Sequence, residues 1–247
     1  MAASMAELAY HAMPDGRRIA YRYLPGNGPA LVFLPGYMSD MAGAKAAALA
    51  EWALARGREC LLLDYSGCGE SNGDFADGTL TRWLEELLAV IAARINGPSV
   101  LVGSSMGGWL MLLAVPELGA RVRGLVGLAA APDFTQWGYT AEEQARLAAR
   151  ETVLRENPFG PAPTPTHAKF WGDGQARRVL AGGIAFAGPV RLLHGLDDGE
   201  VPYDLSLKLA AALHSQDVQV TLVKGGDHRL SRPEDVDLLL RTIASLS

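Results

Sequence analysis

A chain of 247 residues, 49% hydrophobic and 20% charged, is long enough to bury a sizeable core and fits one large α/β domain. The net charge of −5 and the lack of a Lys/Arg run argue against a nucleic-acid partner, because neutralising phosphates requires a concentrated basic surface. No stretch of about 18 apolar residues occurs, so we expect no integral membrane segment.

The first residues contain no apolar core of a signal peptide, which argues against export. The two cysteines, Cys60 and Cys68, are too few for the disulfide framework of a small secreted protein. We therefore expect a soluble, cytoplasmic protein, or a mitochondrial matrix protein if a transit peptide has been removed.

Short segments rich in Val, Ile and Leu alternate with longer amphipathic segments, which favours parallel strands joined by helices. The turn signal Pro14-Asp15-Gly16 indicates an antiparallel hairpin at the N-terminus. Strands are predicted over Arg17–Tyr23, Ala30–Leu34, Glu59–Asp64, Ser99–Gly103, Gly124–Leu128, Pro189–His194 and Val218–Val223. Helices are predicted over Asp40–Arg56, Leu80–Ile95, Met106–Val115, Tyr203–Leu213 and Pro233–Leu246. The result is a single domain, 1–247, with a mostly parallel sheet between helices.

The 133–188 segment breaks this alternation, because it is far longer than an ordinary crossover between two buried strands. Its first half, Thr140–Glu156, is rich in Ala, Glu and Arg and predicts a helix. Its middle, Asn157–Thr166, is proline-rich and predicts a hinge or a polyproline II stretch. The segment follows a strand whose carboxyl end should face the active-site crevice, so we interpret it as an inserted helical lid. A plain linker is the alternative.

A strand-to-helix turn carries the string Gly103-Ser104-Ser105-Met106-Gly107. Glycines two positions either side of the serine are needed, because helix and strand pack too closely there for side chains. This is the pattern of a nucleophile elbow, which exposes a serine hydroxyl at the end of a sheet. We predict that Ser105 is a nucleophile.

A serine hydroxyl attacks only when a base takes its proton, and the elbow therefore requires a histidine. Four of the five histidines fit poorly: His11 precedes the elbow, His167 lies in the proline-rich insertion, His194 ends a buried strand and His214 ends a surface helix. The fifth, His228, lies in a glycine-containing loop between the last strand and the last helix. We predict His228 as the base, with a solvated loop histidine as the alternative.

The base needs a carboxylate that holds its tautomer and stabilises its cationic form. The loop after the penultimate strand offers Asp197 and Asp198 and, as a weaker option, Glu200. Periodicity does not choose between neighbouring residues.

Hydrolysis also needs hydrogen-bond donors for the oxyanion. The Met106 N–H follows the nucleophile at the start of a helix, where the helix dipole favours negative charge. The Tyr37 N–H follows Pro35-Gly36 directly after an earlier strand, although Pro-Gly is also an ordinary turn signal. We predict these two amides as the oxyanion hole.

The glycine-rich segment Asp64–Ser71 follows a strand but lacks the Lys-Ser/Thr of a phosphate loop and the glycine spacing of a dinucleotide site. We interpret it as a tight structural turn in which Cys68 is a small turn residue. No Cys or His pair has the spacing of metal ligands. We expect no cofactor and no metal.

These motifs resemble the serine α/β-hydrolase superfamily. The resemblance rests on Pro35-Gly36-Tyr37, Asp64–Ser71, Gly103–Gly108, His194–Pro202 and Asp227-His228. In that family the acid is the third residue after His-Gly and lies three before Val-Pro, which corresponds to Asp198. The resemblance implies an α/β-hydrolase fold with Ser105, Asp198 and His228 as its triad.

A narrower resemblance is to the mitochondrial palmitoyl-protein thioesterase and acyl-glucuronide esterase group among the abhydrolase-domain proteins. It rests on Pro35–Met41, Val102–Leu112 and Arg191–Gly195. The similarity extends over the core from Leu31 to Arg241 and fades in the insertion, so it implies the reaction class more strongly than the acyl specificity.

The residues together predict a serine hydrolase of carboxylic esters or thioesters that acts through an acyl-enzyme. Its partner would be a small acyl ester or thioester, or an acylated protein. Candidate residues for an acyl pocket, with burial in the core as the alternative, are Trp109, Trp137, Phe159 and Phe170. Two other functions stay open: an amide or peptide hydrolase with the same triad, and a non-catalytic ligand receptor on this scaffold.

Overall fold

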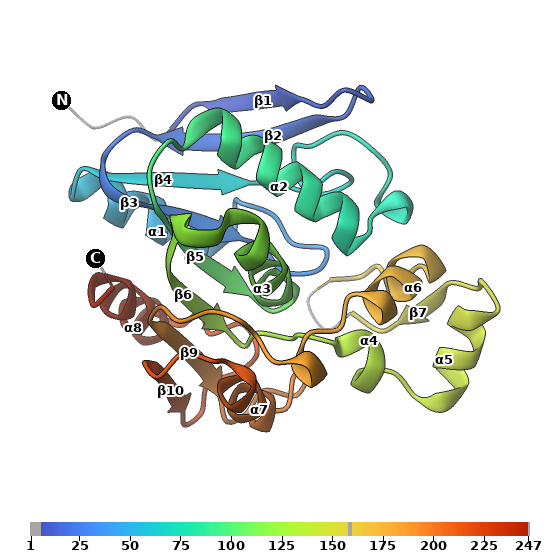
Figure 1. Cartoon of the computed structure of the whole chain (residues 1–247). Helices are drawn as coiled ribbons and strands as arrows, with labels where there is room; N and C mark the ends of the chain where they lie inside the picture. The colour runs from blue at the N-terminus through green and yellow to red at the C-terminus, as the bar shows by residue number, and fades with distance from the viewer. Residues whose placement is uncertain (1–5, 158–159, 247) are drawn as a thin grey trace.

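The computed structural model describes residues 6–157 and 160–246. Within these ranges an eight-stranded sheet has the strand order β1-β2-β4-β3-β5-β6-β9-β10 (Figure 1). Its strands are β1 (Leu8–Ala12), β2 (Arg18–Leu24), β3 (Asn27–Leu34), β4 (Arg58–Leu63), β5 (Ser99–Ser104), β6 (Val122–Leu128), β9 (Val190–Gly195) and β10 (Val218–Val223). The strands β4, β3, β5, β6, β9 and β10 run parallel, whereas β1 and β2 form an antiparallel hairpin at one edge. The predicted mostly parallel sheet with an N-terminal hairpin is confirmed.

Helices cover both faces of the sheet (Figure 1). One face carries α1 (Ala44–Ala55) and α8 (Pro233–Ala244), and the other carries α2 (Leu80–Arg94), α3 (Met106–Leu118) and α7 (Asp204–Ala212). Successive strand side chains point to opposite faces, so Val32 packs in the cluster of Trp109 and its neighbour Leu31 in the cluster of Trp52. Burial on both faces is the reason why β3 and β5 read as continuous apolar runs.

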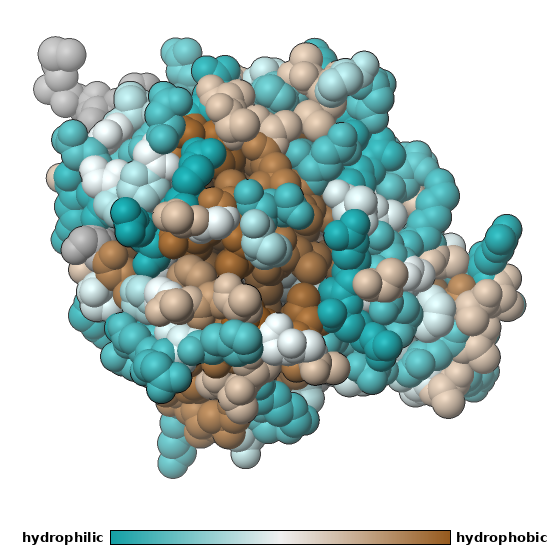
Figure 2. Space-filling model, viewed as in Figure 1, coloured by the Kyte–Doolittle hydropathy of each residue, from teal (hydrophilic) through white to brown (hydrophobic). Residues whose placement is uncertain are grey.

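Helix α3 is apolar on every side, and most of its first two turns is buried. Such a helix belongs in the core rather than at the surface. Figure 2, viewed from the side of α2 and α3, shows an apolar area over the middle of the molecule with hydrophilic side chains around it. The partly buried Leu113 and Leu118 of α3 pack against the core beneath. The sheet and α3 thus form a rigid base for the residue between them, Ser105.

The 133–188 segment differs from its predicted structure. It contains α4 (Phe134–Trp137), α5 (Ala141–Ala148), β7 (Val153–Arg155), β8 (Thr164–Thr166), α6 (Ala168–Ala176) and the short helix η3 (Leu180–Gly182). The predicted helix over Thr140–Glu156 is wrong beyond Ala148. Helix α5 begins with a capping box between Thr140 and Glu143, and the chain then turns through Arg150 at a φ of 69°.

The residues after that turn pair as a strand, because β7 finds an antiparallel partner in β8. The predicted hinge or polyproline II stretch is therefore wrong over Thr164–Thr166, where Pro165 lies in a two-stranded sheet. Proline is tolerated there, because a short edge strand does not require its missing N–H. Residues 158–159 lie outside the described residues.

The helix predicted from Asp40 begins only at Ala44. The Asp40 carboxylate accepts a hydrogen bond from the Ala42 N–H at 2.8 Å, which gives the backbone an alternative to the helix. The remaining short helices are η1 (Phe75–Asp77) and η2 (Gly119–Arg121). None of the helices within the described ranges is long and apolar enough to cross a membrane.

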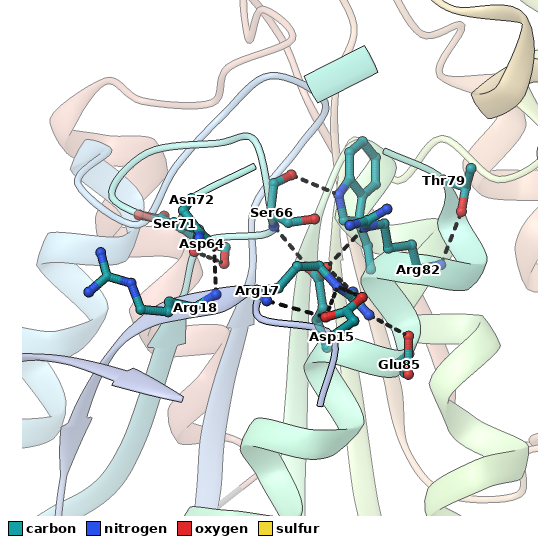
Figure 3. Close-up of polar contacts among 12 residues, drawn as sticks. Asp15, Arg17, Arg18, Asp64, Ser66, Ser71, Asn72, Thr79, Arg82 and Glu85 are labelled. Carbon is teal, nitrogen blue, oxygen red and sulfur yellow. Dashed lines mark hydrogen bonds and ion pairs between the residues drawn. The ribbon is translucent and has the colours of Figure 1, made fainter. Parts of the chain in front are cut away.

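The turn after β4 is tied to β2 by side chains (Figure 3). The Ser71 hydroxyl accepts from the Ala20 N–H at 2.8 Å and donates to the Asp64 carbonyl at 2.7 Å. The Asn72 side-chain oxygen accepts from the Arg18 N–H at 2.6 Å. These bonds satisfy the backbone of a turn that leaves the sheet, and the turn thereby keeps a fixed shape.

A buried carboxylate links this turn to α2 and to the hairpin. Glu86 of α2 is fully buried and accepts hydrogen bonds from the Ser66 N–H at 2.8 Å and from the Arg17 guanidinium. Arg17 also pairs with Asp15 at 2.7 Å and with Glu85 at 2.9 Å. A buried charge is tolerated only with such partners.

Replacing Arg17 by methionine keeps an apolar stem but removes the cation beside Glu86. We expect the free energy of unfolding to fall by about 3 kcal/mol, because the buried Glu86 loses its nearest cation and keeps only Arg82, 3.7 Å away, as a charged partner. Urea denaturation measures this change. Arg18→Met, at the exposed neighbouring position, is the control and should change stability by less than about 0.5 kcal/mol. Equal effects of both variants would contradict a structural role for the Arg17–Glu86 pair.

Candidate active site

Ser105 occupies a strained backbone conformation between β5 and α3. Its φ of 52° and ψ of −119° are unfavourable for a residue with a side chain, and such strain persists only when the surroundings enforce it. The close backbone packing at the two flanking glycines, Gly103 and Gly107, enforces this conformation. A Cβ on Gly107 would lie 2.1 Å from the Leu34 carbonyl oxygen, and a Cβ on Gly103 would lie 2.5 Å from the Gly107 carbonyl oxygen. The glycine spacing therefore follows from direct backbone packing around the serine.

Three side chains from distant segments form one hydrogen-bonded chain. The Ser105 hydroxyl lies 3.1 Å from His228 Nε2, and His228 Nδ1 lies 2.8 Å from Asp198 Oδ2. Asp198 follows β9, His228 follows β10 and Ser105 follows β5, so all three lie at the carboxyl ends of parallel strands. That edge is where open α/β sheets form their sites.

The loop after β9 distinguishes the three carboxylates. Asp198 has a buried side chain, and its Oδ1 accepts from the N–H groups of Glu200 at 2.9 Å and Val201 at 2.8 Å. Burial raises the pKa of Asp198, but hydrogen bonds from His194 and His228 outweigh it and hold the pKa well below its usual range. Asp197 is exposed. Asp198 is thus the carboxylate that contacts His228, and it is ionised at neutral pH.

The third carboxylate, Glu200, lies farther from the histidine. Its Oε2 is 4.0 Å from His228 Nε2, and its side chain is half-exposed. Burial and the nearby Asp198 raise the pKa of Glu200, although His228 opposes the shift.

The two amides predicted for the oxyanion lie on either side of the serine. Met106 is the first residue of α3, and Tyr37 follows Gly36 in the loop after β3. A Cβ on Gly36 would lie 3.4 Å from the Ser105 Cβ, so this loop runs directly against the serine. Neither N–H donates to an acceptor within residues 6–157 and 160–246.

A pocket of about 650 Å³ opens over Ser105 and His228. Its volume falls within the range of about 300–1,000 Å³ that is common for small-molecule sites. The 133–188 segment supplies part of its wall through Phe134, Trp137 and Arg155. Trp109 and Phe170, two of the candidate acyl-pocket residues, are instead buried in the core, and Phe159 lies outside the described residues.

Comparison with known proteins identifies the family of this chain. The model of the alpha/beta hydrolase family matches residues 31–237. The chain belongs to this family. It is 38% identical to the mitochondrial palmitoyl-protein thioesterase ABHD10 of Mus musculus, over 99% of this chain and 82% of that protein. Both the predicted α/β-hydrolase fold and the resemblance from which it was inferred are confirmed.

Solved structures of the family are also similar. The alpha/beta hydrolase domain-containing protein 10 from mouse superposes with a TM-score of 0.90 at 34% identity and covers 98% of each chain. The crystal structure of the protein named "Putative hydrolase" from Agrobacterium vitis S4 has the same TM-score at 40% identity, over 97% of this chain and 99% of its own.

In this α/β hydrolase the Tyr37 side chain contacts the 133–188 segment. Its hydroxyl donates to the Pro165 carbonyl of β8 at 2.9 Å, and its ring packs against Phe170 with 4.7 Å between centroids. Burial raises the pKa of Tyr37, so the phenol stays protonated and remains a donor. One residue therefore borders Ser105 with its backbone and holds β8 with its side chain.

Lys45 is a site residue that no sequence motif indicates. It lies on α1, lines the pocket, and its Nζ donates to the Arg229 carbonyl and to the Ser231 hydroxyl at 3.4 Å. Burial and the nearby Arg229 lower the pKa of Lys45 to about 8. The contact ties α1 to the loop that carries His228. Of the histidines that were not predicted as the base, His194 contacts Asp198, and the others take no part in the hydrogen bonds among Ser105, His228 and Asp198.

Neither thiol carries the features of a nucleophile. Burial raises the pKa of Cys60 and of Cys68 to about 12 each, so both stay protonated. No cluster of three or more His, Cys, Asp or Glu side chains that would suit a metal occurs within the described part of the chain.

Replacing Gly107 by alanine tests the packing at the elbow. The added Cβ would collide with the Leu34 carbonyl, and we expect a loss of about 1–3 kcal/mol in the free energy of unfolding. Chemical denaturation measures the loss. Gly97→Ala is the matched control, because nothing lies within 4 Å of a Cβ there. If Gly107→Ala is as stable as Gly97→Ala, the elbow is not closely packed.

Proposed function

We propose that this chain is a serine hydrolase of carboxylic esters or thioesters that acts through an acyl-enzyme. The observation that carries the proposal is the continuous hydrogen-bonded chain from Ser105 through His228 to Asp198 at the floor of a pocket. A serine hydroxyl, an imidazole and a buried carboxylate in this order constitute the machinery of acyl transfer.

In the first half-reaction the Ser105 hydroxyl attacks the acyl carbon while His228 Nε2 takes its proton. The carbonyl oxygen becomes an oxyanion, which accepts hydrogen bonds from the N–H groups of Tyr37 and Met106. Each such donor is worth about 3 kcal/mol in the transition state. The protonated His228 then gives its proton to the departing alcohol or thiol, leaving the acyl group on Ser105.

In the second half-reaction a water molecule replaces the leaving group. His228 takes a proton from the water as it attacks the acyl carbon, and then returns a proton to Ser105 as the acid is released. Asp198 keeps the imidazole in the tautomer with hydrogen on Nδ1 and stabilises its cationic form in both steps. Atoms and charges balance without a cofactor, since water is the only further reactant.

The substrate class rests on the relatives and on the pocket. A relative that is 38% identical is named as a palmitoyl-protein thioesterase, which favours an acyl thioester or ester, free or attached to a protein. In our proposal the 133–188 segment is a lid, because it forms one wall of the pocket over Ser105. We expect the protein in the cytoplasm or in the mitochondrial matrix, and the relative from Mus musculus is named as mitochondrial.

A panel of p-nitrophenyl esters, acyl-CoA thioesters and aminoacyl amides tests the reaction class. We expect turnover of esters or thioesters, and a loss on the order of 10⁶ in kcat for Ser105→Ala, because a triad without its nucleophile retains little activity. Ser245→Ala, an exposed serine at the end of α8, is the control. Turnover of the amides alone would replace the proposal with an amide hydrolase. Full activity of Ser105→Ala would refute it.

Tyr37→Phe tests whether the side chain of Tyr37 holds the lid. The variant keeps the ring and the backbone N–H but loses the hydrogen bond to Pro165. We expect KM to rise about fivefold at nearly constant kcat, the effect of one hydrogen bond of about 1 kcal/mol that acts on binding.

Steady-state kinetics separates the two constants, and Tyr10→Phe, at an exposed position on β1, is the control. A fall in kcat with an unchanged KM would show that the hydroxyl acts on the chemical step instead of on the lid.

A further inference from the structure

His194 is a buried histidine whose two ring nitrogens both make polar contacts. It is the last residue but one of β9, and its side chain is fully buried. Its Nδ1 lies 2.7 Å from the Ser206 hydroxyl of α7. Its Nε2 lies 3.0 Å from the Val201 carbonyl oxygen and 3.1 Å from Asp198 Oδ2. The ring therefore spans the space between α7 and the loop that carries the candidate catalytic acid.

These partners determine the tautomer of His194. The Val201 carbonyl and the Asp198 carboxylate only accept hydrogen bonds, so Nε2 must carry the proton that they share. A hydroxyl can donate, and Ser206 satisfies Nδ1 of a neutral ring by doing so. A neutral ring thus satisfies every partner, and it avoids the cost of burying a positive charge.

The Asp198 carboxylate consequently faces two imidazoles with the same oxygen, and the Nε2–H of His194 is shared between this oxygen and the Val201 carbonyl. Oδ2 lies 2.8 Å from His228 Nδ1 and 3.1 Å from His194 Nε2. The backbone N–H groups of Glu200 and Val201 hold Oδ1. His228 lies on a different loop, which Lys45 of α1 contacts, so it is tied to the sheet less directly than His194. Of the side chains that contact Oδ2, His194 is the one anchored to β9.

We infer that His194 is a positioning residue of the catalytic triad. It holds the Asp198 carboxylate in the orientation that receives His228 Nδ1–H, and the Ser206 hydroxyl holds His194 in the tautomer that can donate. The inference rests on the proposed function of Asp198 and His228. Without the His194 donor, Oδ2 loses its anchor to β9, and the imidazole of His228 is no longer held in line with Ser105.

A histidine that merely fills the core would behave differently. An apolar side chain of similar size would then replace it without effect on the reaction, because no hydrogen bond to Asp198 would matter. The comparison of His194→Leu with His194→Gln separates these two roles. Leucine fills space without a donor, whereas the glutamine amide can place an N–H near the position of Nε2.

We expect His194→Leu to lower kcat about tenfold to a hundredfold on the best ester or thioester of the panel, at a nearly unchanged KM, as for a misplaced catalytic group. His194→Gln should recover kcat to within about fivefold of the wild type, the difference that one imperfect hydrogen bond of about 1 kcal/mol makes. Thermal unfolding of each variant shows that the molecules compared are folded. Equal kcat values for His194→Leu and the wild type would overturn the inference.

Ser206→Ala provides a second variant if His194→Leu does not fold. It leaves the His194 ring in place but removes the donor to Nδ1, and kcat should fall about fivefold, as expected for one lost hydrogen bond of about 1 kcal/mol. An unchanged kcat would show that the tautomer of His194 does not matter.

Nuclear magnetic resonance tests the geometry without any substrate. In the wild type the ¹⁵N signals of His194 should show a neutral ring with the proton on Nε2, and the proton shared by His228 and Asp198 should give a downfield resonance. This resonance should shift in His194→Leu and return in His194→Gln.

If the wild type hydrolyses nothing in the panel but these signals behave as expected, the proposed function fails and the placement of Asp198 by His194 stands. If hydrolysis proceeds and the downfield resonance does not move in His194→Leu, the inference fails and the proposed function stands.

Discussion

The backbone of α3 packs directly against the end of β3, and the site depends on this contact. A Cβ on Gly107 would lie 2.1 Å from the Leu34 carbonyl oxygen, so a residue with any side chain would push the helix away from the sheet. The close approach keeps Ser105 in its strained conformation and sets the Met106 N–H at the start of a helix. It also brings the loop of Tyr37 against Ser105. One packing constraint thus places the hydroxyl and both candidate oxyanion donors.

The electrostatics of the site centre on Asp198, a charge that is buried but surrounded by donors. Its oxygens accept from two imidazoles and two backbone N–H groups, which keeps it ionised despite its burial. Tyr37 joins the same site to the 133–188 segment through its bond to Pro165. A substrate entering the pocket would therefore meet a floor on the sheet and a wall that the Tyr37–Pro165 hydrogen bond and the buried Phe170 attach to the core.

The sequence indicated the sheet and the elbow well, because both leave local signals. Alternation predicts buried strands, and glycines two residues either side of Ser105 predict the turn. The strand pairing of Val153–Arg155 with Thr164–Thr166 left no such signal, since it depends on a partner distant in the chain and overrides local helix propensity. Asp198 and its neighbour Asp197 are equivalent by spacing, and the resemblance to a family, not periodicity, selected Asp198. The contact of Lys45 with Arg229 arises only once α1 and a loop distant in the chain have folded together. His194 lies only four residues before Asp198, but its ring contacts could not be read from the residue pattern.

The central claim is that Ser105 is an activated nucleophile, and a fluorophosphonate probe tests it most directly. The probe reacts covalently with an activated serine, and peptide mass spectrometry then locates the adduct on the chain. The account predicts one adduct per chain, on the peptide that contains Ser105. An unlabelled protein under conditions that label other serine hydrolases, or an adduct on a different residue, would contradict it and favour a ligand receptor on the same scaffold.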